Sequence, residues 1–352
     1  MRIAITADLH LTTRQKHPER YHALENIFQQ MLDEDINTIF IAGDLFDESS
    51  RNYAEFDNFC SGKAYTEFEI IVIPGNHDSS LEQSEFTSGN LKIYSQPTLR
   101  DFERLAVLFL PFKAGKTMGD YVSRFAGDLA ENNWLLVGHG DWAAGMSEPN
   151  PFEPGVYMPL TRSDLETFKP AKVILGHIHK PMQHGGVHYV GSPCGLDIRE
   201  TGPRRFLILN TESAKVEPRK VDTEKIFFNE SFIIHPVDDE SDYIRKQIAA
   251  RIKSWQLQPE DLARVQIKVS VFGYSANKRK LMETIKECFR KFSFYKNWPP
   301  DLSGVSTADD INRAEVANRV FRWIKQYDWH ESNDQPTKKD IFYEALKVIY
   351  ED

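Results

Sequence analysis

Eight side chains that can bind metal ions or transfer protons follow short apolar runs in the first 180 residues. They are Asp8, His10, Asp44, Asn76, His77, His139, His177 and His179. Imidazole nitrogens mixed with carboxylate and amide oxygens suit Mn²⁺, Fe²⁺ or Zn²⁺, whereas Mg²⁺ and Ca²⁺ favour all-oxygen sites. The set contains no cysteine, which argues against a structural zinc cluster. We therefore expect a divalent metal centre.

The candidate ligands are too many for a single ion. Two ions about 3.5–4 Å apart that share one carboxylate account for them economically. Such a pair lowers the pKa of a bridging water, so that hydroxide exists near neutral pH, and it neutralises the charge that builds on a phosphate in the transition state. The chemistry indicated is hydrolysis of a phosphoester by a metal-bridging hydroxide, without a covalent enzyme intermediate.

His77 is the imidazole beyond those needed for the metals. It follows the candidate ligand Asn76 directly, and it could stabilise charge on the phosphate or protonate the leaving alkoxide. Asp78 is next in the chain and would hold the tautomer of His77. The predicted catalytic residues are therefore His77 and Asp78.

Each candidate stands at the end of a strand that is predicted from a β-branched or apolar run. These runs are residues 2–7, 38–42, 70–73, 134–137 and 172–175. Apolar residues at helical spacing predict helices over residues 18–31 and 53–65, between the first three strands. The alternation indicates an α/β fold of layered sheets flanked by helices. The carboxyl ends of the strands gather on one edge, where such folds bind ligands.

Other predicted segments of the first 210 residues carry none of the eight candidate side chains. A strand is expected at 105–111, a helix at 118–132, and strands at 187–190 and 205–209. Residues 142–159 are rich in Gly, Pro and aromatics and predict a surface loop, whose Trp142 and Tyr157 either touch substrate or pin the loop. The remaining histidines are interpreted as surface or helix-cap residues: His17, His22, His184, His188, His235 and His330.

Five spaced motifs occur in order along the first 180 residues. They are Asp8-x-His10, Gly43-Asp44, Gly75-Asn76-His77-Asp78, Gly138-His139 and Gly176-His177-x-His179. Residues 1 to about 210 therefore resemble the calcineurin-like metallophosphoesterase superfamily. The resemblance implies that the first ion is held by Asp8, His10, Asp44 and His179, and the second by Asp44, Asn76, His139 and His177. Asp44 would bridge two divalent ions per chain, with Mn²⁺ expected ahead of Fe²⁺, Zn²⁺ or Mg²⁺.

Finer features resemble the SbcD-type nuclease subunits of double-strand-break repair complexes. They are Gly43-Asp44-Leu45-Phe46-Asp47, Gly176-His177-Ile178-His179-Lys180-Pro181 and Tyr189-Val190-Gly191-Ser192-Pro193. The resemblance implies an exonuclease or endonuclease that acts on DNA in repair or recombination. It also implies a small capping domain that contacts DNA, and a C-terminal helical segment that docks on an SbcC-type coiled-coil ABC ATPase subunit. A homodimer is compatible with it.

The order of segments here is similar. The sequence becomes polar at 211–222, so we expect a phosphoesterase (nuclease) domain at 1–222, a small α/β capping domain at 223–300 and a helical tail at 301–352. The densest basic run includes Lys278, Arg279, Lys280, Arg290 and Lys291. A solvated helix face and a wall of a DNA groove explain it equally well. The apolar helices of the tail pack either on their own domain or on the partner.

Composition bounds these expectations. The net charge of −9 argues against a uniformly basic coat, but a local basic groove remains compatible with it. Three widely spaced cysteines, no apolar run of membrane-spanning length and no secretory signal predict a cytoplasmic protein without membrane contact. The alternative function is a phosphodiesterase or phosphatase for nucleotides or other small phosphoesters. A non-catalytic subunit is disfavoured, because no metal ligand of the pattern is missing.

Overall fold

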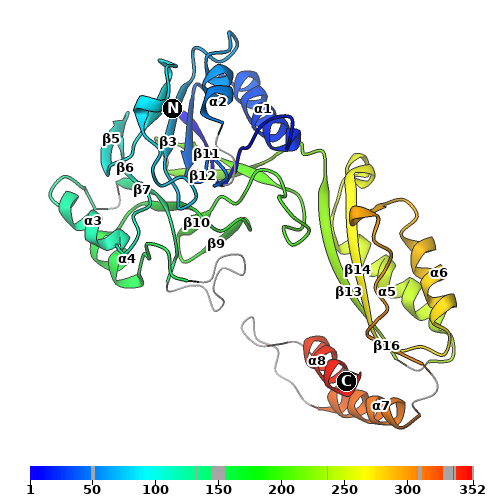
Figure 1. Cartoon of the computed structure of the whole chain (residues 1–352). Helices are drawn as coiled ribbons and strands as arrows, with labels where there is room; N and C mark the ends of the chain where they lie inside the picture. Colours follow the sequence, from blue (N-terminus) through cyan, green and yellow to red (C-terminus); the bar gives the residue numbers. More distant parts are fainter. Residues whose placement is uncertain are drawn as a thin grey trace. The chain divides into compact units, whose positions relative to one another are not determined.

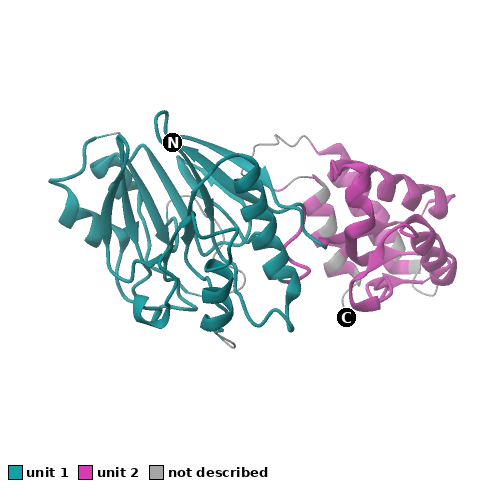
Figure 2. Cartoon of the chain, turned by 90° about the horizontal axis from the view of Figure 1, so that it is seen from above, with its two compact units in different colours: residues 1–196, 203–224 teal, residues 197–202, 225–352 magenta. Residues whose placement is uncertain are grey.

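The structure of the protein is a computed structural model. It describes residues 1–48, 52–131, 133–143, 155–235, 237–307, 311–327, 336 and 338–350. The chain forms two compact units (Figure 2). Each unit has its own hydrophobic core. Residues 1–196 and 203–224 form the first unit, and residues 197–202 and 225–352 form the second. The first unit holds the predicted phosphoesterase domain except residues 197–202, and the second holds the two segments predicted to follow it except residues 223 and 224.

The first unit contains two six-stranded sheets (Figure 1). One has the order β12-β11-β1-β2-β3-β4, with β1 (Arg2–Thr6), β2 (Thr38–Ala42), β3 (Glu69–Ile73), β4 (Leu91–Ile93), β11 (Arg205–Asn210) and β12 (Lys215–Lys220). The other has the order β5-β6-β7-β8-β10-β9, with β5 (Thr98–Phe102), β6 (Leu105–Leu110), β7 (Trp134–His139), β8 (Lys172–Gly176), β9 (Met182–His184) and β10 (Val187–Tyr189). Strands β1 to β4 are parallel, and so are β6, β7, β8 and β10, so their carboxyl ends share one edge of each sheet.

The two faces of each sheet are buried against different layers. Along β1, Ile3 and Ile5 belong to the core between the sheets, whereas Ala4 belongs to the core beneath the helices. Side chains alternate along a strand, so a strand that is buried on both faces needs the continuous apolar runs seen in the sequence. Helices α1 (Pro18–Asp33) and α2 (Tyr53–Cys60) cover the first sheet. Helices α3 (Met118–Phe125) and α4 (Arg162–Phe168) cover the second. The result is the layered α/β fold that the sequence predicts.

Several boundaries differ from the prediction. Helix α2 ends at Cys60 and α3 at Phe125, earlier than expected, and Gly62 and Gly127 follow these ends. Glycine is unfavourable inside a helix, which explains the early stops. Helix α4 was not predicted, although Thr161 and Asp164 form a reciprocal capping box at its start. The unpredicted strands β4, β5, β9 and β12 lie at or beside sheet edges, where weaker apolar patterns suffice.

The second unit is built on two long parallel strands, β13 (Ile226–Ile234) and β14 (Val265–Tyr274). The two short strands β15 (Ser293–Phe294) and β16 (Val305–Ser306) also pair with β14. Helices α5 (Glu240–Ser254) and α6 (Lys278–Cys288) share a core with alternate residues of the strands. Short 3-10 helices occupy Gln83–Glu85 in the first unit and Pro259–Arg264 and Tyr295–Asn297 in the second.

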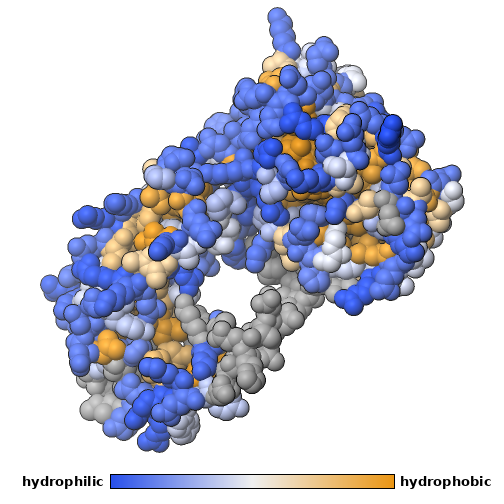
Figure 3. Space-filling view, turned by 180° about the vertical axis from the view of Figure 1, so that it is seen from behind, coloured by the Kyte–Doolittle hydropathy of each residue, from blue (hydrophilic) through white to orange (hydrophobic). Residues whose placement is uncertain are grey.

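The last two helices, α7 (Ile311–Gln326) and α8 (Lys338–Tyr350), pack on their own unit. Ala317, Phe342 and Leu346 form a small core with Ile233 of β13. The pair nevertheless leaves large apolar side chains exposed, among them Trp323 and Tyr327. Hydrophobic residues also show as separate patches on the mostly hydrophilic face in Figure 3. Within the described ranges, no helix combines the length and the apolar character that a membrane span requires.

Candidate metal centre

The seven predicted metal ligands converge at the carboxyl ends of five strands. Asp8 and His10 follow β1, Asp44 follows β2, Asn76 follows β3, His139 ends β7, and His177 and His179 follow β8. Parallel strands place these positions on a shared edge of each sheet, and the packing of the two sheets brings the edges together.

One group of ligands surrounds the loop after β1. Nε2 of His10 lies 3.0 Å from Nε2 of His179, and ligand atoms of Asp8, His10 and His179 all lie within 4.8 Å of one another. Two atoms that are each about 2.1 Å from one ion, at right angles, are about 3 Å apart. The spacing therefore fits a shared cation.

A second group surrounds the amide of Asn76. Its Oδ1 lies 2.8 Å from Nε2 of His139 and 3.1 Å from Nδ1 of His177. Asp44 joins the two groups, because its Oδ2 lies 3.3 Å from Nε2 of His139 and 3.7 Å from Nε2 of His10. This arrangement suits two cations with Asp44 between them.

The electrostatics of the carboxylates also fit bound cations. Burial raises the pKa of Asp8 to about 6, although His179 and His139 oppose the rise. The Asp8 Oδ2 atom is buried and has no hydrogen-bond partner among the residues that the structure describes. A buried carboxylate oxygen without a donor is costly, and a divalent ion would supply the missing positive charge.

The pKa values of His10 and His139 shift in opposite directions. Burial lowers the pKa of His10 to about 3, which keeps this ring neutral, as a metal ligand must be. Burial alone would lower the pKa of His139, but the charges of Asp44 and Asp8 raise it to about 10. Burial alone would raise the pKa of Asp44, but His139 and other imidazoles hold it well below its usual range. The centre of the site therefore favours positive charge beside Asp44.

The backbone is strained at the ligands. Asp8, His10, Asp44 and His177 have φ of 53°, 46°, 50° and 91°, a region that residues other than glycine rarely adopt. Such strain persists where the surrounding structure holds it, typically at functional sites. Two motif glycines allow the close approach: an added Cβ would lie 2.0 Å from Nδ1 of His139 at Gly43, and 2.1 Å from Oδ1 of Asp44 at Gly75.

Two buried arginines that sequence reasoning missed hold ligand loops in place. Arg20 donates to the backbone carbonyl of His10, and Arg204 donates to the backbone carbonyl of His179. Arg204 also donates to the carbonyl and hydroxyl oxygens of Ser192, at 2.9 and 2.5 Å. A signal exists for Arg20, since it stands on the apolar helical stripe that continues through Leu24. We find no comparable signal for Arg204.

The predicted catalytic residues lie beside the first group. The partly exposed His77 ring meets the His10 ring edge to face, with centroids 4.8 Å apart, and its backbone N–H donates to Asp44 Oδ1 at 2.9 Å. Asp78 is fully buried and accepts backbone N–H groups of Gly75 and Phe46, at 2.7 and 3.1 Å. Asp78 thus ties the loop after β3 to the loop after β2. Its action on the tautomer of His77 stays a prediction.

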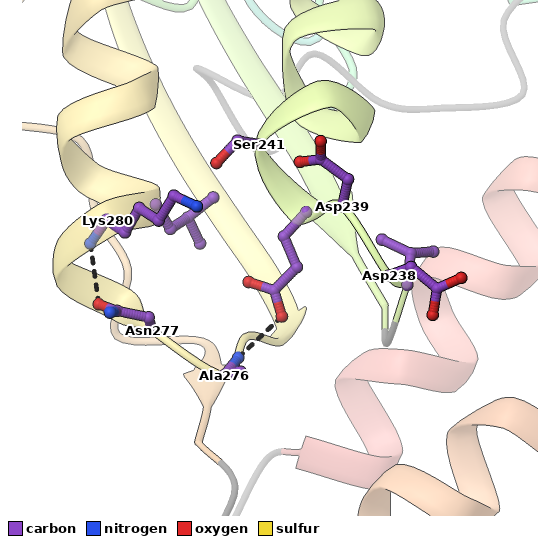
Figure 4. Close-up of a pocket in the computed structure, with 9 residues that line it drawn as sticks. Asp238, Asp239, Ser241, Ala276, Asn277 and Lys280 are labelled. Carbon is purple, nitrogen blue, oxygen red and sulfur yellow. Dashed lines mark hydrogen bonds between the residues drawn. The ribbon is translucent and has the colours of Figure 1, made fainter.

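The structure does not gather the predicted DNA-binding residues at one point. Lys278, Arg279 and Lys280 form the first turn of α6, whereas Arg290 and Lys291 follow the end of that helix. All except Lys278 are exposed. Arg279 lies 3.3 Å from Glu283, and Lys280 lines a pocket with Asp238, Asp239, Ser241 and Asn277 (Figure 4). The basic run is therefore split between the two ends of one helix.

The loop aromatics and the histidines outside the motifs lie in different surroundings. Trp142 is buried and donates to Nδ1 of His184 at 3.3 Å, so it pins its segment. Tyr157 lies against the ring of His177. His17 and His22 are near Glu19 and Glu224, as surface residues would be, but His188 is buried and His235 lies among aromatic rings. His330 lies outside the described residues.

The fold and the candidate ligand groups are typical of the metal-dependent phosphoester hydrolases, a class that uses a dinuclear divalent centre. The chain belongs to the calcineurin-like phosphoesterase family, which matches residues 1–198, more than half of its length. It is 24% identical over 161 residues to exonuclease subunit 1 of Enterobacteria phage T4. The match covers 42% of this chain and 44% of that relative, so the chain spans less than half of the relative's length.

Solved structures with a similar arrangement include three distant proteins. An archaeal phosphodiesterase is 17% identical, covering 63% of this chain and 100% of its own, with a TM-score of 0.34. A protein from Thermus thermophilus is 13% identical, covering 62% and 98%, with a TM-score of 0.40. A dimetal phosphatase from Danio rerio is 11% identical, covering 63% and 96%, with a TM-score of 0.39.

Proposed function

We propose that the protein is a two-metal DNA nuclease, acting as an exonuclease or endonuclease in repair or recombination. The observation that carries the proposal is the pair of ligand groups that share Asp44, with His77 beside them. The relative named as an exonuclease subunit supports a nucleic-acid substrate and a multi-subunit setting. Mn²⁺ is the ion that we expect, ahead of Fe²⁺ and Zn²⁺, which the mixture of imidazole nitrogen and oxygen donors suits as well.

Each residue of the site has a different role in the proposed hydrolysis. Two bound ions would lower the pKa of a water and neutralise charge on the phosphate. His77, partly exposed and in ring contact with His10, is placed to stabilise the phosphate and to protonate the leaving oxygen. Asp78 holds the loop that carries His77. Arg20 and Arg204 keep His10 and His179 in position through their backbone carbonyls.

The start of helix α6 is the proposed contact for the DNA backbone. Three cations there are unfavourable to the helix itself, since the N-terminal end of a helix dipole is positive. The same end attracts phosphates, and a bound phosphate would offset the repulsion. With 11 residues α6 is about 16 Å long. Arg290 and Lys291 at its other end would thus meet the same strand about five nucleotides away, at about 3.4 Å for each.

The exposed face of α7 is the proposed docking site for the SbcC-type coiled-coil ATPase. Val316 and Trp323 of α7 and Tyr327 just after its end are exposed, and their spacing of seven and four residues places them along one helical stripe. A neighbouring side of the helix packs on its own unit through Ala317. The predicted tail at 301–352 would then have two faces, one for its own core and one for the partner. A homodimer stays a prediction. The three free cysteines support a cytoplasmic location.

The alternative function is hydrolysis of nucleotides or other small phosphoesters. The net charge of −9 and the carboxylates of Asp238 and Asp239 beside Lys280 favour it, because both repel a DNA backbone.

One comparison separates the two functions. With Mn²⁺, we expect the protein to degrade linear DNA and also to hydrolyse bis(p-nitrophenyl) phosphate. Replacing Lys278, Arg279, Lys280 and Lys291 with Gln should weaken DNA binding and flatten its salt dependence, by about one unit of slope for each lost phosphate contact. Lys246→Gln with Lys253→Gln on helix α5 is the matched control and should leave both activities unchanged.

The outcomes point in different directions. Hydrolysis of the small substrate without any DNA cleavage would support the alternative function. Equal losses on both substrates in the α6 variant would indicate misfolding and would remove the case for DNA contact at this helix.

A further inference from the structure

Asp141 lies between a predicted metal ligand and a neighbouring segment, and neither the sequence motifs nor the family match gives it a role. The residue is only 9% exposed. Its Oδ2 accepts the backbone N–H of Tyr157 at 2.7 Å, and its Oδ1 lies 3.5 Å from Nε2 of His177. One carboxylate therefore faces both a loop and the second ligand group.

The backbone around Asp141 is held from several sides. Asp141 N–H donates to the Tyr157 carbonyl, and Leu160 N–H donates to the Asp141 carbonyl, both at 2.8 Å. The hydroxyl of Tyr189 donates to the carbonyl of Gly140 at 3.1 Å and accepts the N–H of Trp142 at 2.6 Å. These contacts fix the backbone at Asp141, and the hydrogen bond from the Tyr157 N–H to Oδ2 sets the direction of the carboxylate toward His177.

The position of the carboxylate decides which nitrogen of His177 carries a proton. A lone pair on Nε2 would face a negative oxygen at 3.5 Å and be repelled, whereas an N–H would be attracted. Nδ1 is then the nitrogen whose lone pair can bind a cation. That atom lies 3.1 Å from Oδ1 of Asn76, on the side where Nε2 of His139 also converges. The Tyr157 ring, with its centroid 4.6 Å from that of His177, restricts rotation of the imidazole.

We propose that Asp141 is a positioning residue for the second ion. It holds His177 as the Nε2–H tautomer, so that Nδ1 faces the metal, and the same carboxylate ties the segment at Tyr157 to the site. Carboxylates that orient ligand imidazoles in this way tune metal affinity. The inference rests on the dinuclear centre of the family and is independent of whether DNA is the substrate.

The test measures metal binding to the whole chain by competition with a chelating dye, using Zn²⁺ and Mn²⁺. Wild type should bind two ions. Asp141→Ala should weaken one of them about 10–100-fold and leave the other unchanged. Asp141→Asn should bind between these limits, because an amide can accept only one of the two N–H groups and presents a donor to the other.

A matched control separates the carboxylate from general packing. Tyr189→Phe removes the hydroxyl that holds the same backbone but leaves Asp141 intact, so it should lower the melting temperature and keep both ions. Nitrogen-15 NMR of the Zn²⁺-loaded wild type should show a proton on Nε2 of His177. An unprotonated Nε2, equal weakening of both ions in Asp141→Ala, or equal metal loss in both variants would overturn the proposal. Loss of DNA cleavage alone would leave it standing.

Discussion

Replacing Asp78 with Asn distinguishes a structural role from a catalytic one. The buried carboxylate accepts two backbone N–H groups, from Gly75 and Phe46. Hydrogen bonds to a charged group contribute about 1.5–3 kcal/mol each. The amide of Asn keeps one acceptor and turns an NH₂ group toward the other N–H, which then stays buried and unsatisfied. These losses would total about 3–5 kcal/mol.

The pKa of Asp78 reduces that figure. Burial, followed by the charge of Asp44, raises the pKa to about 6, so the ionised form is itself disfavoured in the fold. The raised pKa offsets about 3 kcal/mol of that loss, so we expect Asp78→Asn to lower the free energy of unfolding by up to about 2 kcal/mol. Urea unfolding at pH 8 with EDTA measures this with the carboxylate ionised and the metals removed. Asp101→Asn, on the exposed surface of β5, is the control and should stay within about 0.5 kcal/mol of wild type.

The contrary result is equally clear. If Asp78→Asn is at least as stable as wild type but loses most of its hydrolytic rate, the carboxylate does not hold the two loops together. Its role would then be the one predicted from the sequence, orientation of the His77 imidazole.

Three further predictions concern other side chains of the first unit. Asp44→Asn should reduce bound metal from two ions per chain and abolish turnover, while circular dichroism stays unchanged; unchanged metal content would contradict a bridging role. His77→Ala should keep metal and DNA affinity but lose about 10²–10³-fold in rate, and a loss of only a few-fold would give His77 another role. Burial alone would raise the pKa of Asp57, but hydrogen bonds from Ser88 and Thr87 lower it. The ionised Asp57 carboxylate therefore stabilises the fold above about pH 4, and this stabilisation is lost as the pH falls through the pKa of the folded state. Asp57→Asn should therefore destabilise the protein at pH 7, and the difference from wild type in urea unfolding should shrink below about pH 4; a difference independent of pH would refute the assignment.

The positions of the candidate ligands at the strand ends were accessible from the sequence, because each depends on local chemistry. A β-branched run predicts a strand, and a Gly or Pro-Gly break places the next polar residue on the loop at its end, as at Asp44 and Asn76. Parallel strands then bring such loops to one edge without further information. The strand ends, the layered α/β class and the family followed from these patterns.

Contacts between distant segments were not accessible in this way. Arg204 reaches the carbonyl of His179, and Asp141 reaches His177, because separate strands and loops are packed together. Neither pair has a spacing that a sequence pattern could reveal. The basic run looked continuous in sequence, but α6 separates Lys280 from Lys291 along its length.

The apolar helices of the tail also show which features the sequence predicts and which depend on the tertiary structure. Helical spacing predicted α7 and α8 and the fact that their apolar sides must be covered. Only the tertiary structure decided that Phe342 and Leu346 are covered by Ile233 of β13, while Trp323 stays exposed. The physical reason is that periodicity specifies which side chains share a face of a helix, whereas the partner of that face depends on how the whole chain packs.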